Sequence, residues 1–215
     1  MKRFLRKLIY LLLYVLSYAL FKLFFSFKVY GKKNELKKGP MIIVSNHLSW
    51  FDFLIMGISL KPDKYIHFLA KEEVFKGILK NFLYFMEILP VRRGKLDRKL
   101  IKQGLYYLSI GENLGIFPES TRSPDGKLHE ENFHDGASYF SIKAGVPILP
   151  VLIKGSFEAF PKHRKLPSFF KKIRTKIYPP IYPDRYMKME FNKETLSLYT
   201  DELKRVFREG LEESW

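Results

Sequence analysis

Six short apolar runs follow one another after Gly39-Pro40, and they constrain the fold more than any other feature of the chain. The runs are MIIVS (41–45), YIHFLA (65–70), EILPV (87–91), LGIFP (114–118), PILPVLI (147–153) and IRTKIYPPI (173–181). Their length and their content of Ile, Val and aromatic residues are typical of buried β-strands. Between them, apolar residues recur at helical spacing, most clearly over 96–108 and again over 196–207. This alternation predicts an α/β fold with a central, mostly parallel sheet flanked by helices.

The chain has 215 residues, of which 47% are hydrophobic, so it can bury one substantial core. We expect an N-terminal membrane-anchoring helical segment over residues 1–38 and one α/β domain over residues 39–215. Pro150 lies inside the run 147–153, and Pro has no N–H group to donate to a neighbouring strand. We therefore expect this run to be an edge strand, to contain a bulge, or to be interrupted at a site.

The first 38 residues combine an apolar stretch with basic and aromatic residues. Residues 8–21 form 14 consecutive uncharged positions, whereas a membrane-spanning helix needs about 20. Ten Lys and Arg against Glu35 alone give the segment a net charge of +9. Lys side chains can reach anionic head groups from an apolar helix. We expect a helix, or a pair of helices, embedded in one leaflet at the cytoplasmic face of the cell membrane.

Three other interpretations of this segment are a tilted single span with Lys22 at the interface, a cleavable signal peptide ending near SYA (17–19), and a core helix of a soluble domain. The basic and aromatic pattern continues beyond residue 19, which argues against a signal peptide. The near absence of polar residues from 8 to 21 argues against a half-exposed core helix.

The whole chain carries 38 Lys and Arg against 22 Asp and Glu, a formal net charge of +16. This excess favours an anionic partner, such as nucleic acid, a membrane surface or a phosphorylated substrate. The basic and aromatic stretch 162–176 could grip single-stranded nucleic acid, but beside an apolar N-terminus it indicates a second membrane-facing patch. We expect an anionic membrane surface and no nucleic acid as partner. The absence of Cys excludes a disulfide framework, a cysteine nucleophile and a thiolate metal site.

The polar cluster SNHLSWFD (45–52) follows the first apolar run, where a strand should turn into a helix. Buried polar groups without partners cost about 1 to 3 kcal/mol, so the cluster lies on an exposed turn or forms its own hydrogen bonds. Asp52 can fold back toward His47 and accept its Nδ1 proton, which leaves Nε2 free as a base. The pair is competent to deprotonate a hydroxyl. The alternative explanation of the same spacing is that the two residues only cap the helix.

NHLSWFD (46–52) resembles the NHxSxxD block of the glycerolipid acyltransferases, the family of the lysophosphatidic acid acyltransferases. Three later stretches resemble further blocks of that family in the same order: ILPVRRG (88–94), FPESTRS (117–123) and VPILPV (146–151). Together the four stretches cover about half of the chain, from 45 to 151. The resemblance implies a glycerolipid acyltransferase-like α/β fold.

The resemblance also implies a reaction: transfer of an acyl chain from a thioester of acyl carrier protein or coenzyme A to the free sn-2 hydroxyl of lysophosphatidic acid, giving phosphatidic acid. His47 would deprotonate the hydroxyl and Asp52 would orient His47, with no covalent acyl-enzyme, no cofactor and no metal. The absence of Cys and of a GxSxG elbow agrees with direct transfer. The alternatives are acylation of another lysolipid and a non-catalytic membrane-binding protein that keeps the fold.

The acceptor-binding residues that the resemblance implies are Lys71, Arg93, Glu119, Ser120, Thr121 and Arg122. The two Arg side chains would hold the phosphate, because a guanidinium group matches phosphate oxygens in a bidentate way. Glu119 would accept a hydrogen bond from the glycerol hydroxyl or position Arg122. Asn46 and Ser49 would support the turn. The stretch 146–151 would be a plain buried strand, or its backbone amides would line an acyl pocket or an oxyanion site.

The sequence departs from the family pattern at three positions. Ser120 stands where the third block usually has Gly, so that turn must avoid a positive φ or accommodate a Cβ near the ligand. Arg92 occupies a position that is often acidic and adds positive charge, and His134 replaces a frequent Lys. His129 and His134 are five residues apart, one too many for the HExxH zinc helix, so we expect no metal site there.

Overall fold

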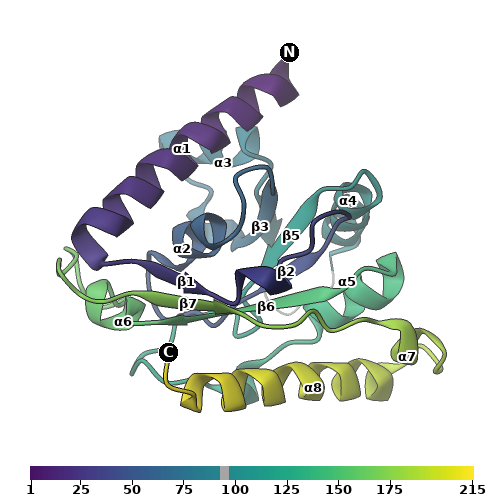
Figure 1. Ribbon diagram of the computed structural model, residues 1–215. Coiled ribbons are helices and arrows are strands. Elements are labelled where there is room, and N and C mark those ends of the chain that lie inside the picture. Colours follow the sequence, from purple (N-terminus) through teal and green to yellow (C-terminus); the bar gives the residue numbers. More distant parts are fainter. Residues whose placement is uncertain (93–96) are drawn as a thin grey trace.

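The computed structural model describes residues 1–92 and 97–215. The strands within these ranges form one seven-stranded sheet in the order β1-β7-β6-β2-β5-β3-β4 (Figure 1). Neighbouring strands run parallel except for β6 and β7, which are antiparallel. The expected α/β fold with a mostly parallel sheet is confirmed.

The strands are β1 (Lys28–Tyr30), β2 (Ile42–Val44), β3 (Ile66–Lys71), β4 (Leu89–Val91), β5 (Asn113–Ile116), β6 (Ile148–Lys154) and β7 (Arg174–Ile177). The α-helices are α1 (Lys2–Phe25), α2 (Asp52–Ser59), α3 (Gly77–Phe85), α4 (Arg98–Ser109), α5 (Gly136–Ala144), α6 (Ser156–Ala159), α7 (Asp184–Met187) and α8 (Lys193–Glu212). Short 3-10 helices cover Lys32–Asn34, Glu72–Val74 and Glu130–Asn132. Each of the six expected strands is present.

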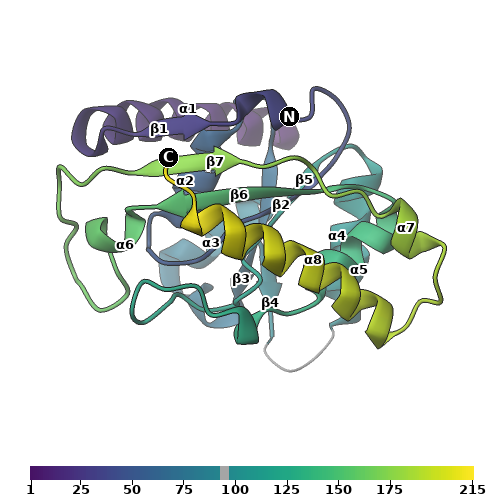
Figure 2. The same ribbon diagram turned by 60° about the horizontal axis from the view of Figure 1, so that its bottom comes forward.

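Successive residues of the central strands point to opposite faces of the sheet, and helices cover both faces (Figure 1). Ile42 and Val44 belong to a core cluster that includes Tyr199 of α8. Ile43, between them, points the other way into a cluster with Met56 of α2. Figure 2 looks onto the first face, with α8 in front of the sheet. Because both faces are buried, the sequences of the strands are continuous apolar runs and do not alternate between apolar and polar residues.

Pro150 lies in β6, which has β2 on one side and β7 on the other, so the expectation of an edge strand is wrong. The carbonyl of Pro150 accepts the N–H of Tyr178 at 2.9 Å, so the side of Pro150 that lacks an N–H faces the continuation of β7. There β7 has already ended at Ile177, and pairing resumes only at the bridge to Ile181. The missing donor is therefore accommodated because the partner strand β7 ends at Ile177, whereas β6 itself continues through Pro150, so the expectation of an interrupted run is wrong as well.

The anchoring segment expected over residues 1–38 is too long. α1 is one continuous helix of 24 residues that ends at Phe25, not a pair of helices. Lys28–Tyr30 then joins the sheet beside β7, so this part belongs to the α/β domain. β1 has only three residues, and both of its ends are exposed, so no apolar run marks it in the sequence.

α1 buries little of its surface against the domain. Its buried residues are Ser17, Phe21 and Phe25, and the two Phe side chains pack in a cluster with residues of α2 and β6. Lys22 does not interrupt the helix, which is long and apolar enough to cross a membrane by length and composition. Only 17% of its apolar window is buried, and this argues against a core helix of a soluble domain.

Candidate active site

The polar stretches 45–52 and 117–123 lie at the same end of the sheet. β2 and β5 are parallel neighbours, and residues 45–52 follow β2 as residues 117–123 follow β5. Open parallel sheets bind their ligands beyond the carboxyl ends of the strands. The two loops are joined through the backbone, because the N–H of Ser123 donates to the carbonyl of His47 at 2.8 Å.

The His47 and Asp52 side chains are in contact, as the sequence suggests. Nδ1 of His47 lies 3.0 Å from Oδ2 of Asp52, and the imidazole ring stacks on Phe117 with centroids 4.2 Å apart. Asp52 is completely buried, whereas 21% of the His47 side chain is exposed. With the carboxylate as acceptor, Nδ1 carries the proton, and Nε2 has no hydrogen-bond partner within the described residues. A histidine held in this way can act as a general base.

Asp52 also folds the loop that carries His47. Its Oδ2 accepts the backbone N–H groups of Leu48 at 2.5 Å and Ser49 at 2.6 Å. Asp52 is the first residue of α2, where the helix dipole favours a negative charge. One carboxylate therefore closes the turn at the start of the helix and also orients the imidazole. Helix capping and orientation of a general base are thus compatible explanations of the spacing.

Asn46 attaches this loop to the neighbouring strand β6, and Ser49 attaches it to Phe160, the residue after α6. The amide of Asn46 donates to the carbonyl of Ile153 at 2.9 Å and accepts its N–H at 2.8 Å. Oγ of Ser49 donates to the carbonyl of Phe160 at 2.8 Å. Both side chains are buried in these contacts, which supply the support expected for the turn.

Glu119 holds the backbone of His47. Its Oε2 accepts the N–H of His47 at 2.6 Å, and its Oε1 is buried without a hydrogen-bond partner in the described part of the chain. Burial raises the pKa of Glu119 to about 8, and the hydrogen bond from His47 opposes this rise only in part. The suggested contact with Arg122 is absent from the described residues. Glu119 therefore positions His47, and its free oxygen can still meet a hydroxyl donor from a ligand.

Ser120, which stands where the third family block usually has Gly, adopts a left-handed conformation. Its φ is 54°, and its N–H closes the turn by donating to the carbonyl of Phe117 at 3.1 Å. The turn accommodates the Cβ because Ser120 is exposed. A non-glycine residue in this region costs about 1 to 2 kcal/mol, and such strain is concentrated at functional sites. Thr121, the next residue, is half-buried.

Arg122 lies flat over an aromatic ring. Its Cζ is 3.3 Å from the ring centroid of Trp50, and 44% of the Trp50 surface is exposed. Among the described residues, no carboxylate forms an ion pair with Arg122. Burial lowers the pKa of Arg122, but a guanidinium group stays charged in proteins. A partly desolvated cation without a carboxylate partner indicates an anionic ligand.

The other expected cations have different positions. Lys71 is half-buried at the carboxyl end of β3, the same end of the sheet as His47. Arg92 forms a bidentate ion pair with Glu72 at 2.7 and 3.0 Å, so the charge that it adds is neutralised. Arg93 lies outside the described residues.

An apolar pocket is lined in part by residues of α2, the helix that begins at Asp52. Its walls come from α1, α2, β3 and the end of α3, and they include Phe53 and Leu54, which follow Asp52 directly. The cavity volume is about 90 Å³. Residues 146–151 do not line this pocket, and 148–151 lie in the buried strand β6, which favours the plain strand interpretation of that stretch.

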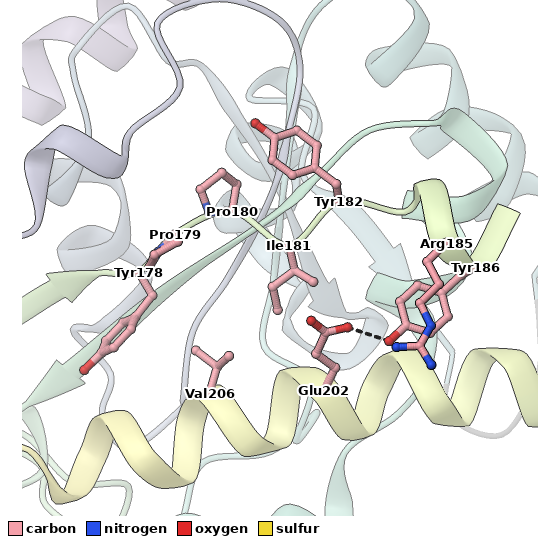
Figure 3. A pocket seen from close by; sticks show the side chains of 9 residues that line it. All are labelled: Tyr178, Pro179, Pro180, Ile181, Tyr182, Arg185, Tyr186, Glu202 and Val206. Carbon is pink, nitrogen blue, oxygen red and sulfur yellow. Dashed lines mark hydrogen bonds between the residues drawn. The ribbon is translucent and has the colours of Figure 1, made fainter.

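A larger cavity of about 380 Å³ lies between residues 178–186 and α8 (Figure 3). Ile181 in its wall pairs with Ile148 at the start of β6, and Ile148 is level with the start of β2. This cavity is therefore at the opposite end of the sheet from His47 and is not part of the site.

Two aromatic residues of the site are not singled out by the sequence pattern. Phe117 stacks on His47, and Trp50 carries Arg122. Both lie inside the stretches that resemble the family blocks. An aromatic residue next to the polar ones was therefore the only sequence feature that could have indicated them. Which ring meets which side chain depends on the approach of two loops that are far apart in the sequence.

Comparison with known proteins shows the family of this chain. The family model described as acyltransferase matches residues 26–154, more than half of the chain. The chain is 28% identical over 185 residues to a 1-acyl-sn-glycerol-3-phosphate acyltransferase of Bacillus subtilis, covering 85% of this chain and 86% of the relative. It is 38% identical over 121 residues to a lyso-ornithine lipid O-acyltransferase of Pseudomonas aeruginosa, covering 55% and 45%.

A solved structure is similar along the whole chain. The crystal structure of the 1-acyl-sn-glycerophosphate (LPA) acyltransferase from Thermotoga maritima matches with a TM-score of 0.76 and 28% identity. The match covers 100% of this chain and 84% of that chain. The sheet and its helices are therefore the arrangement of a known acyltransferase.

Glu119 should make the stability of the protein depend on pH. Its pKa of about 8 in the folded protein lies above the ordinary value of 4.5, so its contribution to stability is complete below 4.5 and is lost as the pH rises through 8. Glu119→Gln keeps an oxygen for the N–H of His47 and cannot titrate. We expect the melting temperature of the wild type to fall more steeply than that of the variant between about pH 5 and about pH 9. Parallel profiles in thermal unfolding would contradict the assignment.

Proposed function

Since this chain belongs to the acyltransferase family and is an O-acyltransferase, we propose that it acylates the free sn-2 hydroxyl of lysophosphatidic acid to give phosphatidic acid. The acyl donor is a thioester of acyl carrier protein or coenzyme A. The observation that carries the proposal is the pairing of His47 with Asp52 beside Arg122, a cation without a carboxylate partner in the described residues. Relatives named for this reaction support the choice of acceptor.

The chemistry follows from the orientation of His47. Nε2 takes the proton of the acceptor hydroxyl while Asp52 stabilises the imidazolium through Nδ1. The alkoxide oxygen attacks the thioester carbonyl and forms a tetrahedral intermediate. The intermediate collapses by breaking the C–S bond, and the imidazolium returns its proton to the departing thiolate. The acyl chain is transferred directly, so no residue of this chain is acylated.

Arg122 supplies the contact to the phosphate. Its guanidinium face is covered by Trp50, so its N–H edges remain for bidentate hydrogen bonds to phosphate oxygens. Ser123 donates its N–H to His47, and this backbone contact keeps the phosphate site close to the base. Lys71, at the same end of the sheet, is proposed to add to this anion site, and the family resemblance alone assigns Arg93 to it.

The apolar pocket lined in part by α2 is proposed to take an acyl chain. Phe53 and Leu54 in its lining follow Asp52 directly in the sequence, and the lining is almost entirely apolar. Transfer of a methylene group from water to such a surface is favourable by about 0.8 kcal/mol. A thioester whose chain lies in this pocket would present its carbonyl near His47.

α1 is proposed to lie in one leaflet at the cytoplasmic face and not to cross the membrane. Arg3, near its start, forms an ion pair with Glu112 of the α/β domain at 2.8 Å, and Phe25 at its end is buried in the domain. Both ends of the helix therefore stay on one side. The exposed rings of Phe169 and Phe170 flank Phe24, with centroids 5.3 and 6.3 Å from its ring, and extend the apolar surface beside the helix.

A second candidate acceptor is another lysolipid. The relative from Pseudomonas aeruginosa has the higher identity, 38%, and is named for a lyso-ornithine lipid. A phosphomonoester offers the Arg122 guanidinium more charge than a carboxylate or a phosphodiester, which favours lysophosphatidic acid. The remaining alternative is not an enzyme: a membrane-binding protein that keeps the fold and the motifs but has no activity.

We expect His47→Ala to abolish acyl transfer with little change in stability. Loss of a general base costs about 10²- to 10⁴-fold in rate. The measurement is thiol release from an acyl thioester in liposomes, with and without lysophosphatidic acid, and His134→Ala on the exposed surface is the matched control. Release by His47→Ala at the wild-type rate would contradict the mechanism. Release by the wild type only with another lysolipid of a panel would reassign the acceptor.

We expect Trp50→Ala to raise KM for lysophosphatidic acid while kcat stays nearly unchanged. A partly exposed cation–π contact is worth about 1 kcal/mol, which corresponds to about a fivefold change in KM. Trp50→Phe keeps a ring under Arg122 and should retain most of the affinity. Trp215→Phe, at the other Trp, is the control. A fall in kcat without a change in KM would show that Trp50 does not act through the acceptor site.

The orientation of α1 can be tested by thiol labelling, because the chain has no Cys. We expect Cys introduced at Lys2 to react with a membrane-impermeant reagent from the cytosolic side of sealed vesicles. Cys introduced at Lys102, on the exposed surface of α4, reports the side on which the domain lies. Labelling of the two positions from opposite sides of the membrane would establish a single span and exclude the one-leaflet arrangement.

A further inference from the structure

α3 has an apolar surface that the α/β domain does not cover. None of its nine residues is buried, and Ile78 is 92% exposed. A helix that is apolar over most of its surface ordinarily lies in a protein core or in a membrane. An exposed apolar patch of this kind indicates a surface that another body covers. The large apolar and aromatic residues of α3 are Ile78, Leu79, Phe82, Leu83, Tyr84 and Phe85.

The apolar side of α3 reaches from the molecular surface to the apolar pocket. Ile78 and Phe82 are four residues apart and Phe85 follows three residues later, so the three form one row along the helix. Leu79 borders this row and is 51% exposed. Phe82 lines the pocket, and Phe85 is half-buried. Only the far end of the row is therefore covered by the protein.

α1 lies beside the end of α3. In Figure 1, α3 is directly behind α1, on the side of the sheet away from α8. Nε of Arg6 donates to the carbonyl of Phe85 at 2.8 Å, and Phe82 lines the same pocket as Leu13 of α1. The exposed apolar surface of α1, which includes Leu16 at 60% exposure, therefore continues onto α3.

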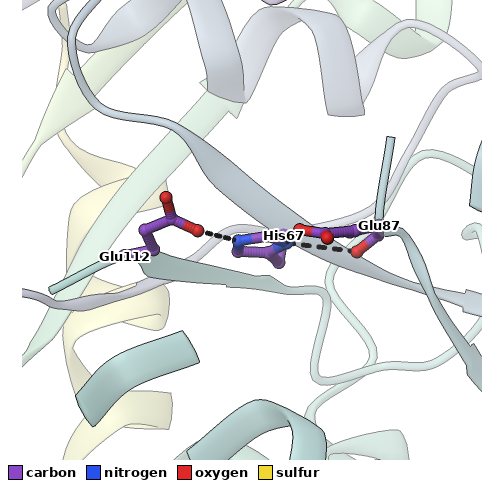
Figure 4. Close-up of side chains that lie close together, drawn as sticks. All are labelled: His67, Glu87 and Glu112. Carbon is purple, nitrogen blue, oxygen red and sulfur yellow. Dashed lines mark hydrogen bonds and ion pairs between the residues drawn. The ribbon is translucent and has the colours of Figure 1, made fainter. Parts of the chain in front are cut away.

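A buried cluster of charged groups fixes the two helices in this arrangement. His67 of β3 is completely buried between Glu87, which follows α3, and Glu112, which precedes β5 (Figure 4). The carboxylate of Glu87 lies 2.5 Å from Arg6, and that of Glu112 lies 2.8 Å from Arg3. The start of α1 and the end of α3 are thereby attached to the same part of the domain. A body that covers α1 must therefore come close to α3.

Two cations border the apolar side of α3. Lys76 stands directly before the helix and Lys80 lies in its first turns, and both are exposed. Neither forms an ion pair with a carboxylate within residues 1–92 and 97–215, in contrast to Arg3, Arg6 and Lys7 of α1. Lys side chains beside an anionic leaflet are attracted to its head groups. Apolar residues next to unpaired Lys are typical of a helix that lies in the membrane interface.

We propose that α3 is a second membrane-inserted element, with its exposed apolar side in the same leaflet as α1. The acyl-chain region of a lipid bilayer covers this side, and Lys76 and Lys80 lie at the head groups. The rim of the apolar pocket, with Leu13 and Phe82 at 37% and 41% exposure, then faces the acyl chains of the leaflet. Entry of an acyl chain from the leaflet into this pocket rests on the proposed function, whereas the insertion of α3 does not.

The test measures the depth of α3 in liposomes with the whole chain. Because the chain has no Cys, one Cys introduced at Ile78 can carry a fluorophore whose emission responds to water. The vesicles contain phosphatidylcholine and phosphatidylglycerol in equal parts, with or without nitroxide groups on their acyl chains. We expect a blue-shifted emission that nitroxide lipids quench as strongly as that of a label at Leu12, on the exposed side of α1.

Lys102 is the matched control for the label. It is exposed on α4, whose Leu108 packs in the core cluster with Tyr199 of α8 on the other face of the sheet. A label at Lys102 should stay in water and be quenched little. A label at Ile78 that emits as it does in water, while the label at Leu12 is quenched, would overturn the proposal.

A second copy of the chain is the other body that could cover α3. In that case the label at Ile78 would be shielded from water but not quenched by nitroxide lipids, and Ile78→Cys would form a disulfide-linked dimer under mild oxidation. This combination would assign the surface to contact between two copies and would also overturn the proposal.

The double variant Lys76→Gln with Lys80→Gln tests the role of the two cations. It should reduce the quenching at Ile78 in vesicles that contain phosphatidylglycerol and leave it unchanged in pure phosphatidylcholine. Lys99→Gln with Lys102→Gln, at two exposed positions of α4, is the control and should change neither. Equal quenching with and without the two α3 cations in the anionic vesicles would overturn their placement at the head groups.

The quenching does not depend on enzymatic turnover, so the insertion of α3 and the proposed reaction can fail separately. An inserted α3 in a protein that releases no thiol with any lysolipid would keep the membrane surface and remove its link to the acyl chain. Thiol release that depends on lysophosphatidic acid, by a protein whose α3 stays in water, would do the reverse.

Discussion

One carboxylate oxygen holds the loop on which the site depends. Oδ2 of Asp52 accepts the N–H groups of Leu48 and Ser49 together with Nδ1 of His47, so the turn, the helix start and the tautomer of the imidazole share a single acceptor. The general base is thereby oriented before any ligand binds. Preorganisation of this kind limits the rearrangement needed in the transition state.

The parallel sheet brings the remaining groups to this loop. β5 and β6 flank β2, so the loops that follow all three strands lie close together at one end of the sheet. Glu119 after β5 accepts the N–H of His47, and Asn46 after β2 pairs with Ile153 of β6. The loop of the base is thus fixed from both neighbouring strands. The strain at Ser120 and the buried, unpartnered oxygen of Glu119 are concentrated at the same place, where a ligand can offset them.

The sequence predicts the parts that depend on local pattern. Six strands and the contact between His47 and Asp52 follow from apolar runs and short spacing, because buried parallel strands are apolar on both faces and a carboxylate five residues away can reach back. β1 is not predictable in this way, since its three residues are held by pairing with a strand more than a hundred residues away. Likewise, Pro150 suggests an edge strand until the interruption after Ile177 is known. The partners of Glu119 and Trp50 depend on how two distant loops meet, which no local pattern contains.

The excess of positive charge does not by itself indicate that the protein binds a membrane surface. The first turns of α1 look like a lipid-facing basic segment, yet Arg3, Arg6 and Lys7 are matched with Glu87 and Glu112 inside the protein. Cations already paired with carboxylates add little attraction for anionic head groups. The attachment of α1 to a bilayer would then depend mainly on its exposed apolar side chains, at about 25 cal/mol for each Å² removed from water. An interface held by apolar area changes little with salt.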